Sequence, residues 1–152
     1  MAQRVRFTAG RVAGFSCPSD KSQAFLWDSD TPGLALRAHV TTTNGRDATG
    51  TALIRVPAWS AAATLHWTVR PGATVSLLAV YADARPDLDF STFPATPVVL
   101  PAYTVLGLRY SVATAAGTWQ VGVDNLLDVA YEPVRGFPAP GRTVFVSYGA
   151  RF

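Results

Sequence analysis

Hydrophobic and polar residues alternate along most of this chain with a period of two, which is the period of a β-strand. The alternation is clearest over residues 59–69, where Trp59, Leu65 and Trp67 share one side and His66 lies on the other. Similar runs occupy residues 34–43, 74–83, 103–112, 119–124 and 143–152, with weaker alternation over 74–83. The pattern predicts an all-β fold, an antiparallel curved sheet of about six strands that follows a small irregular N-terminal segment.

The segments that join these runs are alternately long and short. Long segments cover residues 44–57, 84–102 and 132–142, whereas residues 70–73 and 113–118 form short turns. Transmembrane β-barrels have this arrangement, and Trp59 and Trp67 would lie ~27 Å apart in a strand, close to the ~25 Å height of a lipid-facing band. The sheet therefore resembles part of a transmembrane barrel. A soluble β-sandwich or a small barrel that binds an apolar ligand would show the same alternation.

The C-terminal residues carry a more specific signal. The run 123–128 reads Val-Asp-Asn-Leu-Leu-Asp, and after it come a Pro- and Gly-rich loop over residues 136–142 and a closing strand that ends in Phe152. This succession resembles the end of TonB-dependent outer-membrane receptors, which have an Asn-Leu-Phe-Asp-like motif, such a loop and a terminal Phe. Leu127 stands where the family usually has Phe. The motif residues are Asp124, Asn125, Leu126, Asp128, Tyr131, Gly136, Pro140, Gly141, Arg142 and Phe152.

The resemblance implies that residues 38–152 form the C-terminal barrel segment of such a receptor. The family imports cobalamin, iron-siderophores and related nutrients through a plugged barrel of roughly 22 strands, so a chain with about six is expected to be a partial receptor that does not transport alone. The implied partners are outer-membrane lipid and the barrel-forming remainder, and the TonB system is engaged only through an N-terminal part that this chain lacks.

The resemblance also implies an outer-membrane location. Residues 1–20, however, contain no hydrophobic core of a secretory signal. A cytoplasmic or unexpressed remnant is therefore the alternative.

Polar residues on the less apolar side of the predicted strands are candidates to face the barrel lumen. These candidates are Arg37, His39, His66, Arg109, Gln120 and Arg151. The two histidines have no third ligand in a metal-binding spacing, so the sequence predicts that they are polar lining rather than a metal site.

Residues 1–37 differ from the rest and are expected to form a separate, truncated segment. Trp27-Asp28, Pro32-Gly33-Leu34 and Leu36-Arg37 resemble the start of the arm-type DNA-binding domain of phage-like tyrosine recombinases. The alternative function is therefore a DNA-binding accessory or an integrase remnant, with Arg4, Arg6, Arg11 and Lys21 as the DNA-contact candidates and weak binding expected from so few cations. Locally, Thr8 is expected to cap a helical turn through residue 12, and residues 24–28 and 34–38 to form a hairpin.

Composition and motifs exclude several other classes. The chain is 49% hydrophobic and 15% charged, and its net charge of +3 is spread without a basic run. No segment approaches the ~18 consecutive apolar residues of a transmembrane helix. Cys17 is the single cysteine, and there is no phosphate-binding loop, nucleophile motif or metal-ligand spacing. Asp83, Asp87 and Asp89 are expected to be solvated loop carboxylates. We therefore expect no enzyme activity, no cofactor and no bound metal.

Overall fold

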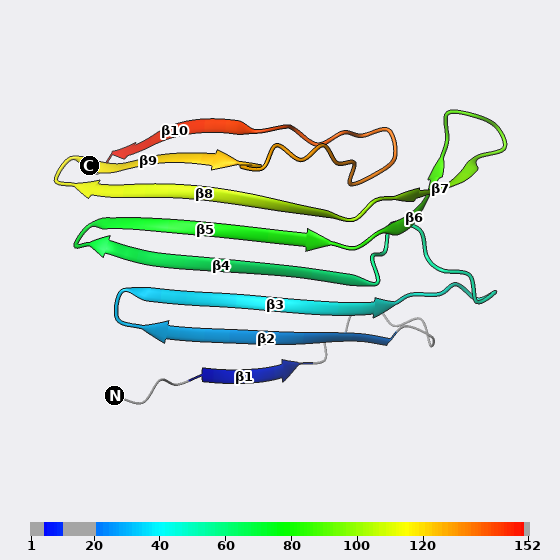
Figure 1. Ribbon diagram of the computed structural model, residues 1–152, viewed down its shortest axis with the longest axis horizontal. Helices are drawn as coiled ribbons and strands as arrows, with labels where there is room; N and C mark the ends of the chain where they lie inside the picture. The colour runs from blue at the N-terminus through cyan, green and yellow to red at the C-terminus, as the bar shows by residue number, and fades with distance from the viewer. Residues whose placement is uncertain (1–4, 11–20, 151–152) are drawn as a thin grey trace.

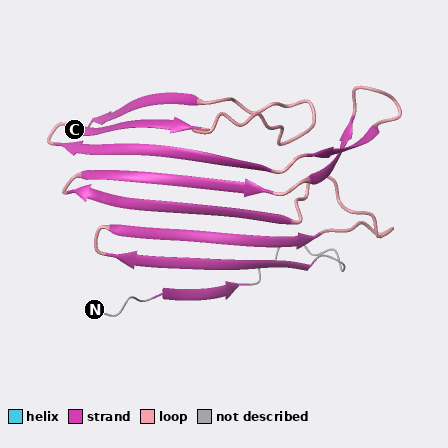
Figure 2. Ribbon diagram, viewed as in Figure 1, coloured by secondary structure: helices cyan, strands magenta, loops and turns pink. Residues whose placement is uncertain are grey.

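A computed structural model describes the backbone of residues 5–10 and 21–150, and the side chains of residues 32–150. Eight strands form one antiparallel sheet in the order β1-β2-β3-β4-β5-β8-β9-β10, and β6 and β7 form a separate two-stranded sheet. Figures 1 and 2 show the broad sheet with this small hairpin at one end. The strands are β1 Val5–Gly10, β2 Lys21–Thr31, β3 Leu34–Asn44, β4 Trp59–Arg70, β5 Ala73–Ala82, β6 Arg85–Asp89, β7 Thr96–Leu100, β8 Tyr103–Thr114, β9 Gly117–Asp124 and β10 Thr143–Ala150.

The prediction of an antiparallel all-β fold is confirmed. The six strands expected from the alternation are β3, β4, β5, β8, β9 and β10, which follow one another in the sheet. Their bounds agree with the predicted ones within a few residues, because period-two patterning fixes which face is apolar and so specifies the register.

The N-terminal segment is more regular than predicted. The hairpin expected at residues 24–28 and 34–38 is present, but its arms are longer, and β2 pairs with β3 from Lys21 opposite Asn44 to Thr31 opposite Leu34. Thr8 lies within strand β1, so the helical turn expected there is wrong over residues 8–10. The predicted junction near residue 37 falls inside β3. The pairing of β1 and β2 onto β3 replaces the irregular segment with two further strands of the same sheet.

Long and short connections lie at opposite ends of the sheet. Residues 32–33, 71–72 and 115–116 make the short turns, and Gly33 and Gly72 adopt the positive φ of 82° and 78° that such turns require. Residues 45–58, 83–102 and 125–142 make the long connections at the other end (Figure 1). The middle one was predicted to be a long loop over residues 84–102, and it contains the β6–β7 hairpin.

Cross-strand register divides the sheet into two chemically different faces. Trp67 is opposite Val75, Val75 is opposite Tyr110, and Tyr110 is opposite Val121, so one face is apolar across four strands. One residue along, His66 is opposite Ser76 and Ser76 is opposite Arg109, so the other face is polar there. The exposed large side chains on the apolar face include Trp59, Trp67, Leu108, Tyr110, Trp119, Val121, Val144, Val146 and Tyr148.

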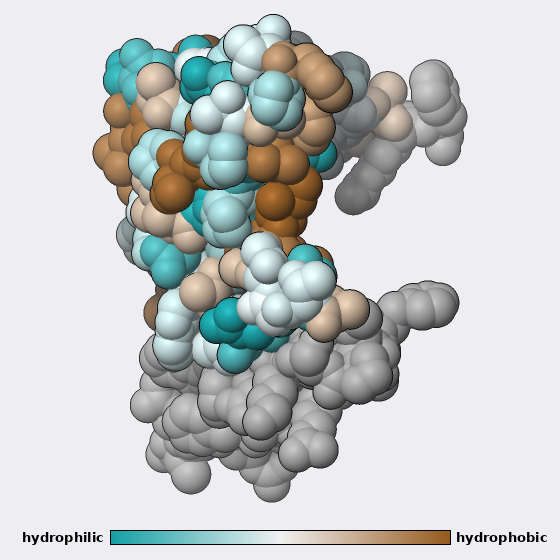
Figure 3. All heavy atoms as spheres, turned by 90° about the vertical axis from the view of Figure 1, so that its right-hand side faces the viewer, coloured by the Kyte–Doolittle hydropathy of each residue, from teal (hydrophilic) through white to brown (hydrophobic). Residues whose placement is uncertain are grey.

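Very little apolar surface is buried. Among the described residues the buried hydrophobic side chains are Ala73, Ala82 and Leu100. A soluble β-sandwich would bury one face of each sheet in a shared core, so this arrangement does not match one. Seen from the long-loop end, the molecule is hollowed on one side (Figure 3). No helix in the described part of the chain has the length and apolar character needed to cross a bilayer.

Candidate functional site

Five of the predicted lumen-facing residues lie on the polar face of the sheet, and Arg151 lies outside the described residues. His66 Nδ1 is 2.8 Å from Ser76 Oγ on the neighbouring strand. Arg109 Nη2 is 3.5 Å from Asp124 Oδ1, and its guanidinium lies 5.5 Å from the centre of the Phe145 ring. The five residues are Arg37, His39, His66, Arg109 and Gln120.

The register keeps the two histidines apart. His39 is opposite Ala62 in the register of β3 and β4. Ala62 lies four residues before His66, so the two histidines are offset by ~13 Å along the strand direction at 3.3 Å per residue. Gln120, on the neighbouring strand β9, donates through Nε2 to Ser111 Oγ at 3.3 Å. Among the residues that the structure describes, no three His, Cys, Asp or Glu side chains are grouped to hold a metal ion.

The predicted family motif forms the base of the 125–142 loop. Asn125 is 3% exposed, and its amide donates to the carbonyl oxygens of Val129 at 2.9 Å and Pro140 at 3.2 Å. The amide oxygen of Asn125 accepts from the Val129 N–H at 2.9 Å. Because one side chain satisfies three backbone groups, it holds the two ends of the loop together.

Asp128 makes a second closure of the same loop. Its carboxylate accepts from the Arg142 N–H at 2.8 Å, and a Cβ added at Gly141 would lie 3.0 Å from the same oxygen. Asn125 and Asp128 have φ values of 51° and 55°, in the left-handed region that Asn and Asp tolerate better than most residues. The motif therefore shapes a loop, and Leu126 anchors it to β8 through its N–H to the Leu106 carbonyl at 2.8 Å.

A buried carboxylate joins the three long connections. Asp87 in β6 is 1% exposed, so the prediction that it is a solvated loop residue is wrong. It accepts from Arg55 Nε at 2.9 Å, from the Arg135 N–H at 2.8 Å and from the Leu88 N–H at 2.8 Å. These partners come from residues 45–58, from 125–142 and from the hairpin itself. We call Asp87, Arg55 and Arg135 the loop clasp.

Arg85 lies beside the loop clasp with its guanidinium buried. Its Nη2 donates to the carbonyl oxygens of Glu132 at 2.9 Å and Pro133 at 2.8 Å, and its Cζ lies 5.2 Å from the centre of the Tyr103 ring. Tyr103 also stacks on Tyr131 with ring centroids 4.2 Å apart. Since Tyr103 occupies a polar-face position of β8, the 125–142 loop folds over that face.

Asp87 of the loop clasp and the neighbouring Asp89 both favour their charged forms. The Arg135 N–H is the main cause that lowers the pKa of Asp87, with further hydrogen bonds from Leu88 and Arg55 acting against the cost of burial. Hydrogen bonds from Ser91 and then Arg135 lower the pKa of Asp89 to about 2. The Arg135 guanidinium, 3.0 Å from Asp89, has a raised pKa because of that carboxylate. The loop end is therefore a set of permanently ionised pairs at neutral pH.

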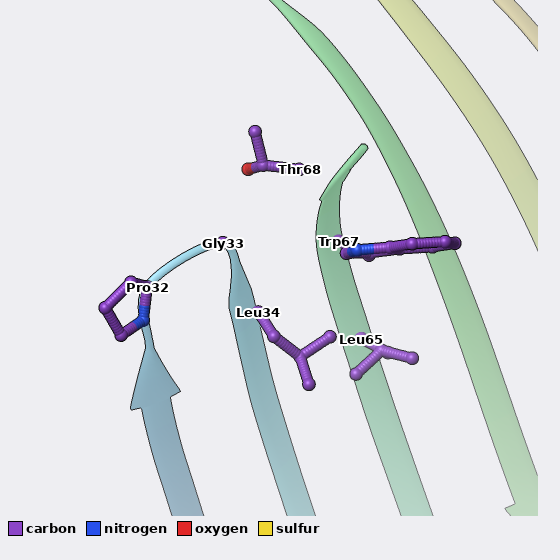
Figure 4. A pocket seen from close by; sticks show the side chains of 6 residues that line it. All are labelled: Pro32, Gly33, Leu34, Leu65, Trp67 and Thr68. Atoms are coloured by element: carbon purple, nitrogen blue, oxygen red, sulfur yellow. The ribbon is translucent and has the colours of Figure 1, made fainter. Parts of the chain in front are cut away.

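Two depressions are lined by described residues. One, of about 520 Å³, runs between the β7 end and residues 130–139 at the long-loop end. The other, of about 310 Å³, lies at the short-turn end between the Pro32-Gly33 turn and β4 (Figure 4). There Leu34, Leu65 and Trp67 lie on the apolar face. The second depression belongs to the surface that a barrel turns toward lipid.

Two of the four DNA-contact candidates lie on described strands. Arg6 in β1 is opposite Asp28, and Lys21 begins β2 opposite Asn44. Arg4 and Arg11 lie outside the described residues, as does the motif residue Phe152.

Fold, register and loop arrangement define a barrel-like segment that resembles TonB-dependent receptors. No protein-family profile matches the chain. Over 73 residues, which are 47% of this chain, it is 37% identical to the vitamin B12 transporter BtuB of Vibrio cholerae serotype O1. That segment is 12% of the transporter's length.

Solved structures show the same fold. The chain matches the pyoverdine outer membrane receptor FpvA from Pseudomonas aeruginosa PAO1 with a TM-score of 0.72 and 16% identity, over 99% of this chain and 25% of the receptor. It matches the siderophore receptor PirA from Acinetobacter baumannii with a TM-score of 0.70 and 14% identity, over 82% of this chain and 21% of the receptor. The chain thus spans a quarter or less of these relatives, which are receptors and transporters rather than enzymes.

Sequence reasoning missed the loop clasp and Arg85. Asp87 lies between Pro86 and Leu88 in a short segment where turn-forming aspartate is the usual interpretation. The available signal was the spacing of Arg85, Asp87 and Asp89, which places three charged side chains on one side of a strand. Their partners, Arg55 and Arg135, lie 32 and 48 residues from Asp87 in the chain.

Proposed function

We propose that this chain forms part of the barrel wall of a TonB-dependent outer-membrane receptor that imports nutrients of the cobalamin or siderophore class. The observation that carries the proposal is the identity of 37% over 73 residues to a vitamin B12 transporter. The two-faced register supports it, because an apolar face with exposed tryptophans suits lipid and a face with His66 and Arg109 suits a watery lumen.

Aromatic positions near the two ends of the strands also support a membrane location. Trp67, Tyr110 and Trp119 lie toward the short turns, and the Tyr148 ring is tilted against the Trp119 ring with centroids 4.6 Å apart. Trp59 begins β4 at the opposite end. Transmembrane barrels carry such rings of aromatic side chains at both interfaces of the bilayer. Under this proposal the short turns face the periplasm and the loop clasp faces outward.

The described sheet does not transport by itself under this proposal. Its outermost strands, β1 and β10, each have one neighbour among the described strands. Unpaired backbone groups in lipid cost several kcal/mol each, so both edges require further strands. The remaining wall, and a segment that contacts the TonB system, would come from a barrel-forming remainder. Residues 21–37 belong to the same wall, because β2 pairs with β3 along its whole length.

A segment exchange tests this function. The part of the Vibrio cholerae transporter that matches this chain is replaced by the matching residues, and vitamin B12 uptake by cells is measured. We expect the exchanged transporter to reach the outer membrane and retain uptake, because strand register and face are kept. The purified chain in liposomes should give neither ion conductance nor uptake. Failure of the exchanged transporter to insert, or uptake by the chain alone, would contradict the proposal.

A further inference from the structure

The depression of about 310 Å³ at the short-turn end is an opening in the apolar face of the sheet. Leu34 of β3 and Leu65 and Trp67 of β4 line it beside the Pro32-Gly33 turn (Figure 4). Leu34 is directly opposite Trp67, and the two side chains are 43% and 52% exposed. We call this depression the apolar notch. Its lining suits an apolar chain better than water.

A β-bulge places a cation on the same face beyond the apolar notch. Strict alternation along β4 would put Arg70 on the polar face together with His66 and Thr68. The register of β4 and β5 instead shifts between Thr68 and Arg70, so that Arg70 is opposite Ala73. Ala73 lies two residues before Val75 and therefore occupies an apolar-face position. Bulges commonly re-aim a side chain in this way, and here the bulge gives the apolar face an arginine.

Arg70 has no carboxylate to pair with on this face. It is exposed, and the ion pairs among residues 32–150 are formed by other arginines. In β2, Asp28 is opposite Arg37 and Asp30 follows in the same phase, so both occupy polar-face positions. None of the described apolar-face positions at the short-turn end is acidic. A guanidinium in this setting favours an anion, and it matches phosphate geometry well.

The spacing of the apolar notch and Arg70 fits a single lipid molecule. Arg70 is three residues beyond Trp67 toward the short turn, at most ~10 Å away at 3.3 Å per residue. Each headgroup layer of a bilayer is about 5–8 Å thick, outside a hydrocarbon core of about 30 Å. A phospholipid with an acyl chain in the notch therefore has its phosphate near the level of Arg70.

We propose that the apolar notch and Arg70 form a binding site for one anionic phospholipid of the leaflet at the short-turn end. The acyl chain lies against Leu34, Leu65 and Trp67, and Arg70 donates to the phosphate. A zwitterionic headgroup brings an ammonium for which this face has no carboxylate, so a headgroup of net negative charge is preferred. The inference rests on the proposed function, because lipid reaches the notch only if the apolar face is turned to the membrane.

The test uses photoactivatable phospholipids in vesicles that hold the chain with its barrel-forming remainder. Each lipid carries a diazirine on one acyl chain, its headgroup is phosphatidylglycerol or phosphatidylcholine, and mass spectrometry maps the labelled residues. We expect labelling of Leu34 and Leu65 to be about fivefold higher with phosphatidylglycerol, the preference that one arginine near anionic lipid supplies. Val146, on the apolar face away from the notch, should be labelled equally by both lipids.

Three variants assign the preference to the cation. Arg70→Gln removes the charge but keeps a polar side chain, and should bring the ratio of labelling at the notch close to one. Arg70→Lys keeps the charge and should retain most of the preference. Arg109→Gln is the matched control, because it removes a cation from the polar face, and it should leave the ratio unchanged.

The outcomes separate the lipid site from the proposed function. Equal labelling of the notch by both lipids, or a preference that persists in Arg70→Gln, would overturn the site while labelling of Val146 still supports a lipid-facing surface. Absence of labelling at both the notch and Val146 would contradict the proposed function and the site with it. Excess inorganic phosphate should leave the ratio as it is in chloride of equal ionic strength, and a lower ratio would show that Arg70 binds free phosphate instead.

Discussion

The strands and the long loops of this molecule are held together by different interactions. In the strand body, cross-strand pairing is continuous from β1 to β10, and large apolar side chains such as Trp67 and Val146 remain exposed. At the long-loop end, the buried polar and charged side chains of the described residues are gathered, namely Arg85, Asp87 and Asn125. Among residues 32–150, the strands of the main sheet bury two hydrophobic side chains, Ala73 and Ala82, whereas the loop end buries hydrogen-bonded polar groups.

The contrast between exposed apolar side chains and buried ionised groups indicates the solvent in which each region is stable. Apolar side chains on one face are stable when lipid covers them, so the body depends on its environment more than on internal packing. Ionised groups such as Asp87 and Arg55 are stable when their partners are complete, so the loop end can hold its shape in water. Three substitutions and one change of pH test this contrast.

Substitution Asp87→Ala should have the largest effect. It leaves Arg55 Nε and the N–H groups of Arg135 and Leu88 without an acceptor, and each donor that stays buried without a partner costs about 1–3 kcal/mol. We expect hydrogen exchange at the Arg135 and Leu88 amides to become fast while amides of β4 and β5 stay protected. Unchanged protection at Arg135 would show that the clasp does not hold the loops.

Substitution Leu77→Arg should weaken membrane insertion without affecting the loops. Leu77 lies near the middle of the apolar face, opposite Leu65 and Leu108, where arginine close to the bilayer midplane costs about 2–4 kcal/mol. Leu78→Arg is the matched control, because Leu78 lies one residue away on the polar face, opposite Thr64. Partition of the two variants into liposomes should differ strongly. Equal partition would contradict the assignment of the faces.

Substitution Asn125→Ala should release the base of the 125–142 loop. It removes three hydrogen bonds to backbone groups, with an expected loss of about 2 kcal/mol. Asn125→Gly is the control for backbone conformation, since Asn125 has a φ of 51° that glycine adopts freely. If the side-chain bonds matter, both variants should lose protection of the Val129 amide. Retained protection in the glycine variant would assign the effect to backbone strain alone.

Acidification should loosen the Asp89–Arg135 pair with a smaller effect. Hydrogen bonds from Ser91 first and then from Arg135 lower the pKa of Asp89 from 3.8 to about 2, so these bonds stabilise the folded loop fully above pH 4 and lose that contribution as the pH falls toward 2. The pair is partly exposed, which limits its contribution. Hydrogen exchange at the Arg135 amide, corrected for its intrinsic rate, should show falling protection as the pH is lowered from 5 to 2. Asp89→Asn should remove this pH dependence. An identical profile in that variant would assign the titration to another group.

The sequence predicted the strand body well and the loop end poorly, for a physical reason. Alternation of Trp59, Leu65 and Trp67 with polar residues reports which side of a strand is buried or lipid-facing, and neighbouring strands must keep that side in register. The partners of Asp87 come from distant segments, and no local pattern encodes that Arg55 and Arg135 converge on it. The Asn125 motif was found by resemblance, but its role in closing the loop required the contacts themselves.

Under the proposed function, one face of this sheet meets lipid and the other meets water. This assignment of the faces can be tested with a nitroxide label on single cysteines, placed one at a time at the described positions 119–123 of β9. Each labelled variant is made in the Cys17→Ser chain and reconstituted with the barrel-forming remainder. Accessibility to oxygen, which concentrates in lipid, should be high at positions 119, 121 and 123, and accessibility to a water-soluble nickel chelate should be high at positions 120 and 122. Accessibility that does not alternate, or the opposite phase, would contradict the account.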